Sequence, residues 1–151
     1  MQPSRKLDAS IAGFVALSLP LMVLFAGDPL FVGLWYYLVV SASALGLAAA
    51  LRTKPLFLCG TSLAVATTFV AYMLVNWRAA HPEGLLVLGH MSSLPGAVIG
   101  LILGVIAARR TQHPATVLML ALMSILGGFF INQVVVCNTL IWCGPLSMDI
   151  G

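Results

Sequence analysis

Long, nearly uncharged apolar runs are the feature of this sequence that most restricts its fold. Each run is long enough to cross roughly 30 Å of hydrocarbon as a helix, at about 1.5 Å per residue. Strands of a membrane β-barrel are about 10 residues of alternating polarity, whereas these runs are longer and apolar on every side. The sequence therefore predicts one all-α domain, residues 1–151, with five transmembrane helices at about 10–27, 30–51, 55–77, 85–108 and 115–136 and a short polar tail at 137–151.

Composition excludes an ordinary water-soluble fold. The 151 residues are 61% hydrophobic and 7% charged, whereas soluble domains carry about 25% charged residues. Because so few charged residues cannot form a polar surface over a core, we expect the protein to be surrounded by membrane lipid. The net charge of +3 comes from basic residues that flank the apolar runs. They form no patch with interleaved aromatic residues, so nucleic acid is not an expected partner.

The basic residues also predict an orientation, because cytoplasmic loops of membrane proteins are enriched in lysine and arginine. With a cytoplasmic N-terminus, only Arg78 lies on the outer side. The expected cytoplasmic set is Arg5, Lys6, Arg52, Lys54, Arg109 and Arg110. Tryptophan and tyrosine prefer the membrane interface, and the expected outer set is Trp35, Tyr36, Trp77 and Trp142. We therefore expect a multi-pass protein of a bacterial inner membrane, with a periplasmic C-terminus.

The N-terminus has features of a signal peptide: a basic start, an apolar stretch and the sequence Phe25-Ala26-Gly27. Cleavage after Ala26 would place Leu24 where a small residue is preferred. We expect an uncleaved first helix. Cleavage would leave four helices with the same loop orientation.

Small residues recur along the fourth run. Spacing of four places Gly96, Gly100 and Gly104 nearly in line on a helix, and Ser93 and Ala108 extend the stripe. Missing side chains let another helix approach closely in lipid. The stripe predicts either packing within this chain or a docking face for another chain. Pro95, on the opposite side, is expected to kink the helix.

His90 is the only histidine inside a predicted span, and it shares the small-residue face. We expect it to point into the bundle and to approach Asn132, which lies at nearly the same depth. Gln133 and Asn76 complete a predicted polar cluster in the outer half of the bundle. An intramembrane ionisable residue is a functional hypothesis by default, so structural pairing, ligand or proton handling, and metal or haem binding are the alternatives. Structural pairing is preferred, and no metal or cofactor is expected.

Cys137 and Cys143 follow the outer end of the fifth predicted helix. An oxidising periplasm would allow a disulfide that closes this short loop, and free thiols are the alternative. The spacing is not the CxxC of a redox enzyme. Cys59 is expected to be a packing residue.

The sequence contains no pattern that predicts catalysis or coupled transport. No predicted span contains Asp or Glu, and we find no phosphate-binding loop, HExxH motif or acidic pair. The expectation is a non-enzymatic membrane protein that acts by helix–helix association. It would be an accessory subunit of a membrane complex or an immunity protein against a pore-forming toxin, and its partner would be a membrane protein, a toxin or a second copy. The alternative is a small oligomeric channel or facilitator for a small solute.

Overall fold

The structure, a computed structural model, describes residues 5–79 and 86–139. These residues form five helices and no strand, which confirms the all-helical prediction. Four of the helices are long and apolar enough to cross a membrane, and α2 is shorter. The helices are α1 (Arg5–Ala26), α2 (Leu34–Ala50), α3 (Phe57–Arg78), α4 (Leu86–Arg109) and α5 (Pro114–Thr139).

The second helix is shorter than the predicted 30–51 because residues 27–33 form a tight turn. The Asp28 carboxylate accepts hydrogen bonds from the backbone N–H groups of Leu30, at 3.1 Å, and Gly33, at 2.6 Å. Gly33 has φ of 77°, a left-handed value that glycine adopts without strain. These contacts delay the start of α2 to Leu34, and its 17 residues extend only about 25 Å.

Two other helices are longer than predicted. The first was expected to begin at residue 10 but begins at Arg5, so that Asp8 lies within α1. The last was expected to end near residue 136 but continues to Thr139. Both extensions take in polar residues, which a hydropathy criterion alone leaves outside a span.

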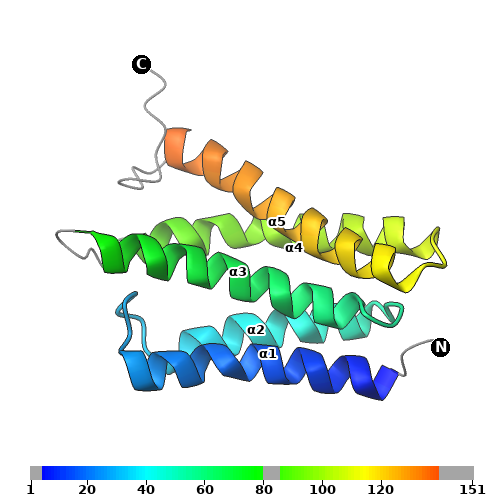
Figure 1. Cartoon of the computed structure of the whole chain (residues 1–151). Coiled ribbons are helices and arrows are strands. Elements are labelled where there is room, and N and C mark those ends of the chain that lie inside the picture. Colours follow the sequence, from blue (N-terminus) through cyan, green and yellow to red (C-terminus); the bar gives the residue numbers. More distant parts are fainter. Residues whose placement is uncertain (1–4, 80–85, 140–151) are drawn as a thin grey trace.

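The helices alternate in direction, and α3 lies between the α1–α2 pair and the α4–α5 pair (Figure 1). α3 contacts all four other helices, and α4 and α5 form the most extensive pair. By contrast, α2 and α4 barely touch. We call the two ends of the bundle the Asp28 end, where α2 and α4 begin, and the Lys54 end, where they finish.

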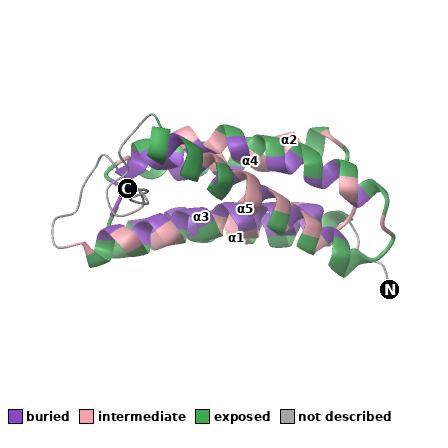
Figure 2. Cartoon of the chain, turned by 90° about the horizontal axis from the view of Figure 1, so that it is seen from above, coloured by how far each residue is buried: buried purple, intermediate pink, exposed green. Residues whose placement is uncertain are grey.

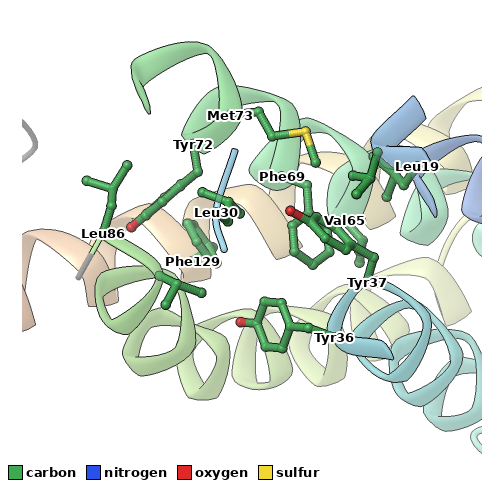
Figure 3. Packing of buried hydrophobic residues seen from close by; sticks show 12 residues of the cluster. Leu19, Leu30, Tyr36, Tyr37, Val65, Phe69, Tyr72, Met73, Leu86 and Phe129 are labelled. Carbon is green, nitrogen blue, oxygen red and sulfur yellow. The ribbon is translucent and has the colours of Figure 1, made fainter. Parts of the chain in front are cut away.

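Buried positions follow the faces along which helices meet, and exposed positions follow the outside (Figure 2). An aromatic cluster occupies the half nearer the Asp28 end, where Tyr36, Tyr72 and Phe129 enter it from three helices (Figure 3). A second cluster, built mainly from alanine, valine and leucine, lies nearer the Lys54 end. The outside is apolar as well: Phe14 is 77% exposed and Ile131 69%. A soluble protein rarely exposes apolar patches on this scale.

Candidate functional site

His90 is completely buried, with 0% of its surface exposed, and both ring nitrogens have partners. Its Nδ1 lies 2.9 Å from the Tyr36 hydroxyl, and its Nε2 lies 3.2 Å from Oγ1 of Thr68. Thr68 donates its own proton to the carbonyl of Val65 at 2.8 Å. Its Oγ1 must therefore accept from Nε2–H, which leaves Nδ1 to accept from Tyr36. This chain of hydrogen bonds assigns a neutral imidazole with both nitrogens satisfied.

Four aromatic rings surround this histidine. Phe69 stacks on it with ring centroids 4.5 Å apart and an interplanar angle of 22°. Tyr72 meets it edge-on at 5.0 Å, Phe129 is tilted at 5.1 Å, and Tyr36 is edge-on at 5.8 Å. We call these five residues the His90 box. It unites α2, α3, α4 and α5 around one polar ring, and it leaves the ring no contact with solvent.

His90 and Asn132 are not hydrogen-bond partners. The partners of His90 are Tyr36 and Thr68, and Asn132 donates instead to the backbone carbonyl of Ser92 at 2.7 Å. The two residues share a depth, but Phe129 of α5 is the side chain that packs on the imidazole. The depth of each residue along its helix could not reveal that side chains of α2 and α3 bind the imidazole.

Asn76 and Gln133, the other predicted polar residues, are both buried. Asn76 is buried, and its Nδ2 donates to the carbonyl of Pro29 in the turn before α2. Gln133 is buried, and its Oε1 has no hydrogen-bond partner among the described residues. The Tyr72 hydroxyl is likewise buried without a hydrogen bond of normal geometry, although it faces Ser93. The predicted grouping of these residues with His90 stays a prediction.

The small-residue face of α4 packs against α5 of the same chain. A Cβ added at Gly96 would collide with Gly128 and Asn132, one at Gly100 with the backbone of Ser124, and one at Gly104 with the Ser124 hydroxyl. Ser93 and Ala108, at the ends of the stripe, are buried at 0% and 2% exposure. The stripe is therefore an internal helix seam, and it is not free to be the docking face of the alternative interpretation.

A shallow groove runs along the outer side of this seam. Its volume is about 440 Å³, and four glycines, Gly96, Gly100, Gly127 and Gly128, form part of its wall. A Cβ at Gly127 would meet nothing within 4 Å, unlike one at Gly100. Apolar side chains flank the glycines, and Ser124 and Asn132 add polar atoms. We call this the α4–α5 groove.

Sequence analysis missed Asp8 as a buried residue. Its side chain is 1% exposed, and its Oδ1 accepts from the backbone N–H of Cys59 at 2.9 Å. Cys59 lies in the first turn of α3, where Leu56 supplies no side-chain cap. Asp8 thus caps α3 from a neighbouring helix, where a negative charge complements the helix dipole. The acidic residue two places before the predicted span was the available signal.

Cys59 is a buried free cysteine, and Cys137 is buried near the end of α5. Cys143 lies outside the described residues, so the disulfide between Cys137 and Cys143 stays a prediction. His81 also lies outside them. Over residues 5–79 and 86–139, no group of three or more His, Cys, Asp or Glu side chains is placed to hold a metal ion.

Comparisons with protein-family models, with curated proteins and with solved structures gave no match to this chain.

Proposed function

We propose that this chain is a multi-pass protein of a bacterial inner membrane with its N-terminus in the cytoplasm and its C-terminus in the periplasm. Support comes from the ends of the bundle. The Lys54 end carries Arg5, Lys6, Arg52, Lys54, Arg109 and Arg110, and the Asp28 end carries Arg78, Trp35 and Trp77. This is the asymmetry that lysine and arginine show across such membranes. The apolar outside of the bundle suits lipid.

We also propose that α1 remains part of the mature protein. α1 packs along α3, and Asp8 caps that helix. Arg5 adds a hydrogen bond from Nη2 to the carbonyl of Thr53 at 3.1 Å. Removal of α1 would leave the first turn of α3 without its cap, so retention is the arrangement that these contacts support.

The function we propose is non-enzymatic association with another membrane protein. The α4–α5 groove is the observation that carries this proposal. Between helices in lipid there is little hydrophobic driving force, so association depends on close backbone approach and polar contacts. The groove offers both, because Gly127 leaves its wall open and Asn132 and Ser124 lie beside it. Its expected occupant is a transmembrane helix of the partner.

Two versions of this function fit the same surface. The chain would be either an accessory subunit of a larger membrane complex or an immunity protein that binds a membrane-inserted toxin. The His90 box belongs to the scaffold in both versions, because the ring is enclosed and its hydrogen bonds are complete. A channel remains the alternative function, and it would require a polar path toward the Lys54 end. The second core cluster fills that half with apolar side chains.

Gly127→Leu tests the proposal, because Gly127 lines the groove and an added Cβ there would meet nothing within 4 Å. Gly46→Leu is the matched control: it lies on α2, also has nothing within 4 Å of an added Cβ, and is remote from the groove. We expect Gly127→Leu to abolish co-purification with a membrane partner, or protection against a toxin, while Gly46→Leu retains it. The proposal would be overturned if both variants kept, or both lost, partner co-purification or toxin protection. Solute flux through liposomes reconstituted with the purified protein would also overturn it.

A further inference from the structure

A second groove lies between α2 and α4 because these helices barely touch. Its volume is about 360 Å³, within the range of small-molecule sites. Its wall is almost wholly apolar and includes Val39, Ala44, Leu47, Leu94, Val98 and Leu101. Along α2 it extends from Trp35 to Leu47, a length of about 18 Å at the helical rise. It uses a different side of α4 from the α4–α5 groove.

A basic pocket lies at the Lys54 end of the same two helices. It has a volume of about 120 Å³, and Arg52, Lys54 and Arg109 line it. Lys54 is already engaged, since its Nζ donates to the carbonyls of Arg109, at 3.0 Å, and Thr111, at 2.5 Å, and so caps the end of α4.

Among residues 5–79 and 86–139, the two arginines of this pocket have no anionic partner. Of the acidic side chains that the structure describes, Asp8 is buried on the backbone of Cys59, and Asp28 lies at the opposite end of the bundle. Arg52 and Arg109 are both exposed, and within residues 5–79 and 86–139 neither side chain makes a hydrogen bond. The pocket therefore presents two uncompensated guanidinium groups.

The groove and the pocket follow one another along α3 and α4. On α4, Leu101 lines the groove and Val105, one turn further on, lines the pocket. On α3, Thr61 lines the groove and Phe57, one turn earlier, lines the pocket. On the α2 side, Leu47 is followed by Arg52. An apolar groove about 18 Å long thus lies one helical turn from a cationic pocket on both helices.

We propose that the groove and the pocket together bind one anionic phospholipid, with its phosphate at Arg52 and Arg109 and an acyl chain along the α2–α4 groove. Arginine matches phosphate geometry with two parallel hydrogen bonds, and basic pockets between transmembrane helices on the cytoplasmic side bind anionic headgroups. An acyl chain is itself apolar and matches the almost wholly apolar wall of the groove, and the phosphate supplies the anion for the two arginines.

This inference rests on the proposed membrane location but not on the proposed partner. Native mass spectrometry of the full-length protein in a neutral detergent would compare phosphatidylglycerol with phosphatidylcholine of identical chains. We expect wild type to retain phosphatidylglycerol about twenty-fivefold better, since each of the two arginines near the headgroup contributes roughly fivefold. The double variant Arg52→Gln, Arg109→Gln is expected to lose this preference. Arg110→Gln, next in sequence but outside the pocket, is expected to keep it.

A second pair of variants tests the acyl-chain groove. Ala44→Phe fills the groove and is expected to weaken the binding of both lipids at least fivefold. Ala42→Phe, on the exposed side of α2, should leave the binding of both lipids unchanged. Arg52→Lys with Arg109→Lys keeps the charge and should retain most of the preference, which guards against a loss caused by misfolding. The proposal would be overturned if Arg110→Gln and the double Gln variant lost the preference for phosphatidylglycerol to the same extent. Unchanged binding by Ala44→Phe, or displacement of the lipid by millimolar inorganic phosphate, would do so as well.

Discussion

The hydroxyl of Tyr36 donates a hydrogen bond to Nδ1 of His90 at 2.9 Å, across the gap between two helices that otherwise barely touch. Tyr36 also lines the α2–α4 groove, so this bond closes the groove on its inner side near the Asp28 end. The His90 box thus fixes the distance between α2 and α4. It gives the groove a defined width without taking part in the proposed binding itself.

His90→Ala should destabilise the protein strongly. The change leaves a cavity among four aromatic rings and removes a partner from both Tyr36 and Thr68, and such large-to-small changes cost about 2–5 kcal/mol. The measurement is the free energy of unfolding in mixed micelles. Leu88→Ala, on the exposed side of the same helix, is the control and should cost far less. Similar losses of unfolding free energy in His90→Ala and Leu88→Ala would contradict the enclosed arrangement of His90.

Gly100→Ala should force α4 and α5 apart. The added Cβ would meet the backbone of Ser124, which cannot move independently of its helix. Overpacking of this kind costs about 1–3 kcal/mol or more. Gly46→Ala, where the added methyl group meets nothing within 4 Å, should be neutral or slightly stabilising. The check is the thermal midpoint of each variant in detergent, and a stable Gly100→Ala protein would show that the seam is looser than described.

Asp8→Ala should loosen the first turn of α3. Loss of a capping carboxylate costs about 0.5–2 kcal/mol, and the Cys59 amide would lose its acceptor. Hydrogen exchange at the Cys59 amide should therefore accelerate, while exchange in the middle of α3 changes little. Asp8→Asn retains an acceptor oxygen and should show a smaller effect. Unaltered exchange at Cys59 in Asp8→Ala would argue against the cap.

The turn before α2 should weaken in acid. Partial burial raises the pKa of Asp28, but hydrogen bonds from the Tyr37 hydroxyl, at 2.7 Å, and from the backbone of Gly33 and Leu30 outweigh it, so the pKa lies below 3.8. A carboxyl group whose pKa is lower in the folded than in the unfolded protein stabilises the fold. This stabilisation is complete above the pKa of the unfolded protein and is lost as the pH falls through the pKa of the folded protein.

The matching measurement compares wild type with Asp28→Asn between pH 6 and pH 3. At pH 6 the variant should be less stable by about 1–2 kcal/mol, because it loses charge-assisted hydrogen bonds that are partly exposed to solvent. The difference in stability between wild type and Asp28→Asn should narrow only below about pH 4. A constant difference across the range would exclude the proposed role of the Asp28 charge.

Much of the architecture could be predicted, because length and hydropathy are local properties of a chain. The apolar runs predicted five helices, and the four-residue spacing of Gly96, Gly100 and Gly104 identified the face of α4 that a helix could approach closely. Helix ends were less certain, because polar residues such as Asp8 and Asn138 can continue a helix when the tertiary structure or their own backbone satisfies them.

The sequence by itself determined that this chain would be a helical bundle with an apolar exterior, since no other arrangement satisfies so many backbone groups beside so few charges. Only the tertiary structure decided which residues meet. Periodicity gives the face of each residue on its own helix, but contact also depends on how neighbouring helices are rotated and shifted. That relative placement enclosed His90 with Tyr36 and Thr68 instead of Asn132, turned the glycine seam toward α5, and left a groove between α2 and α4.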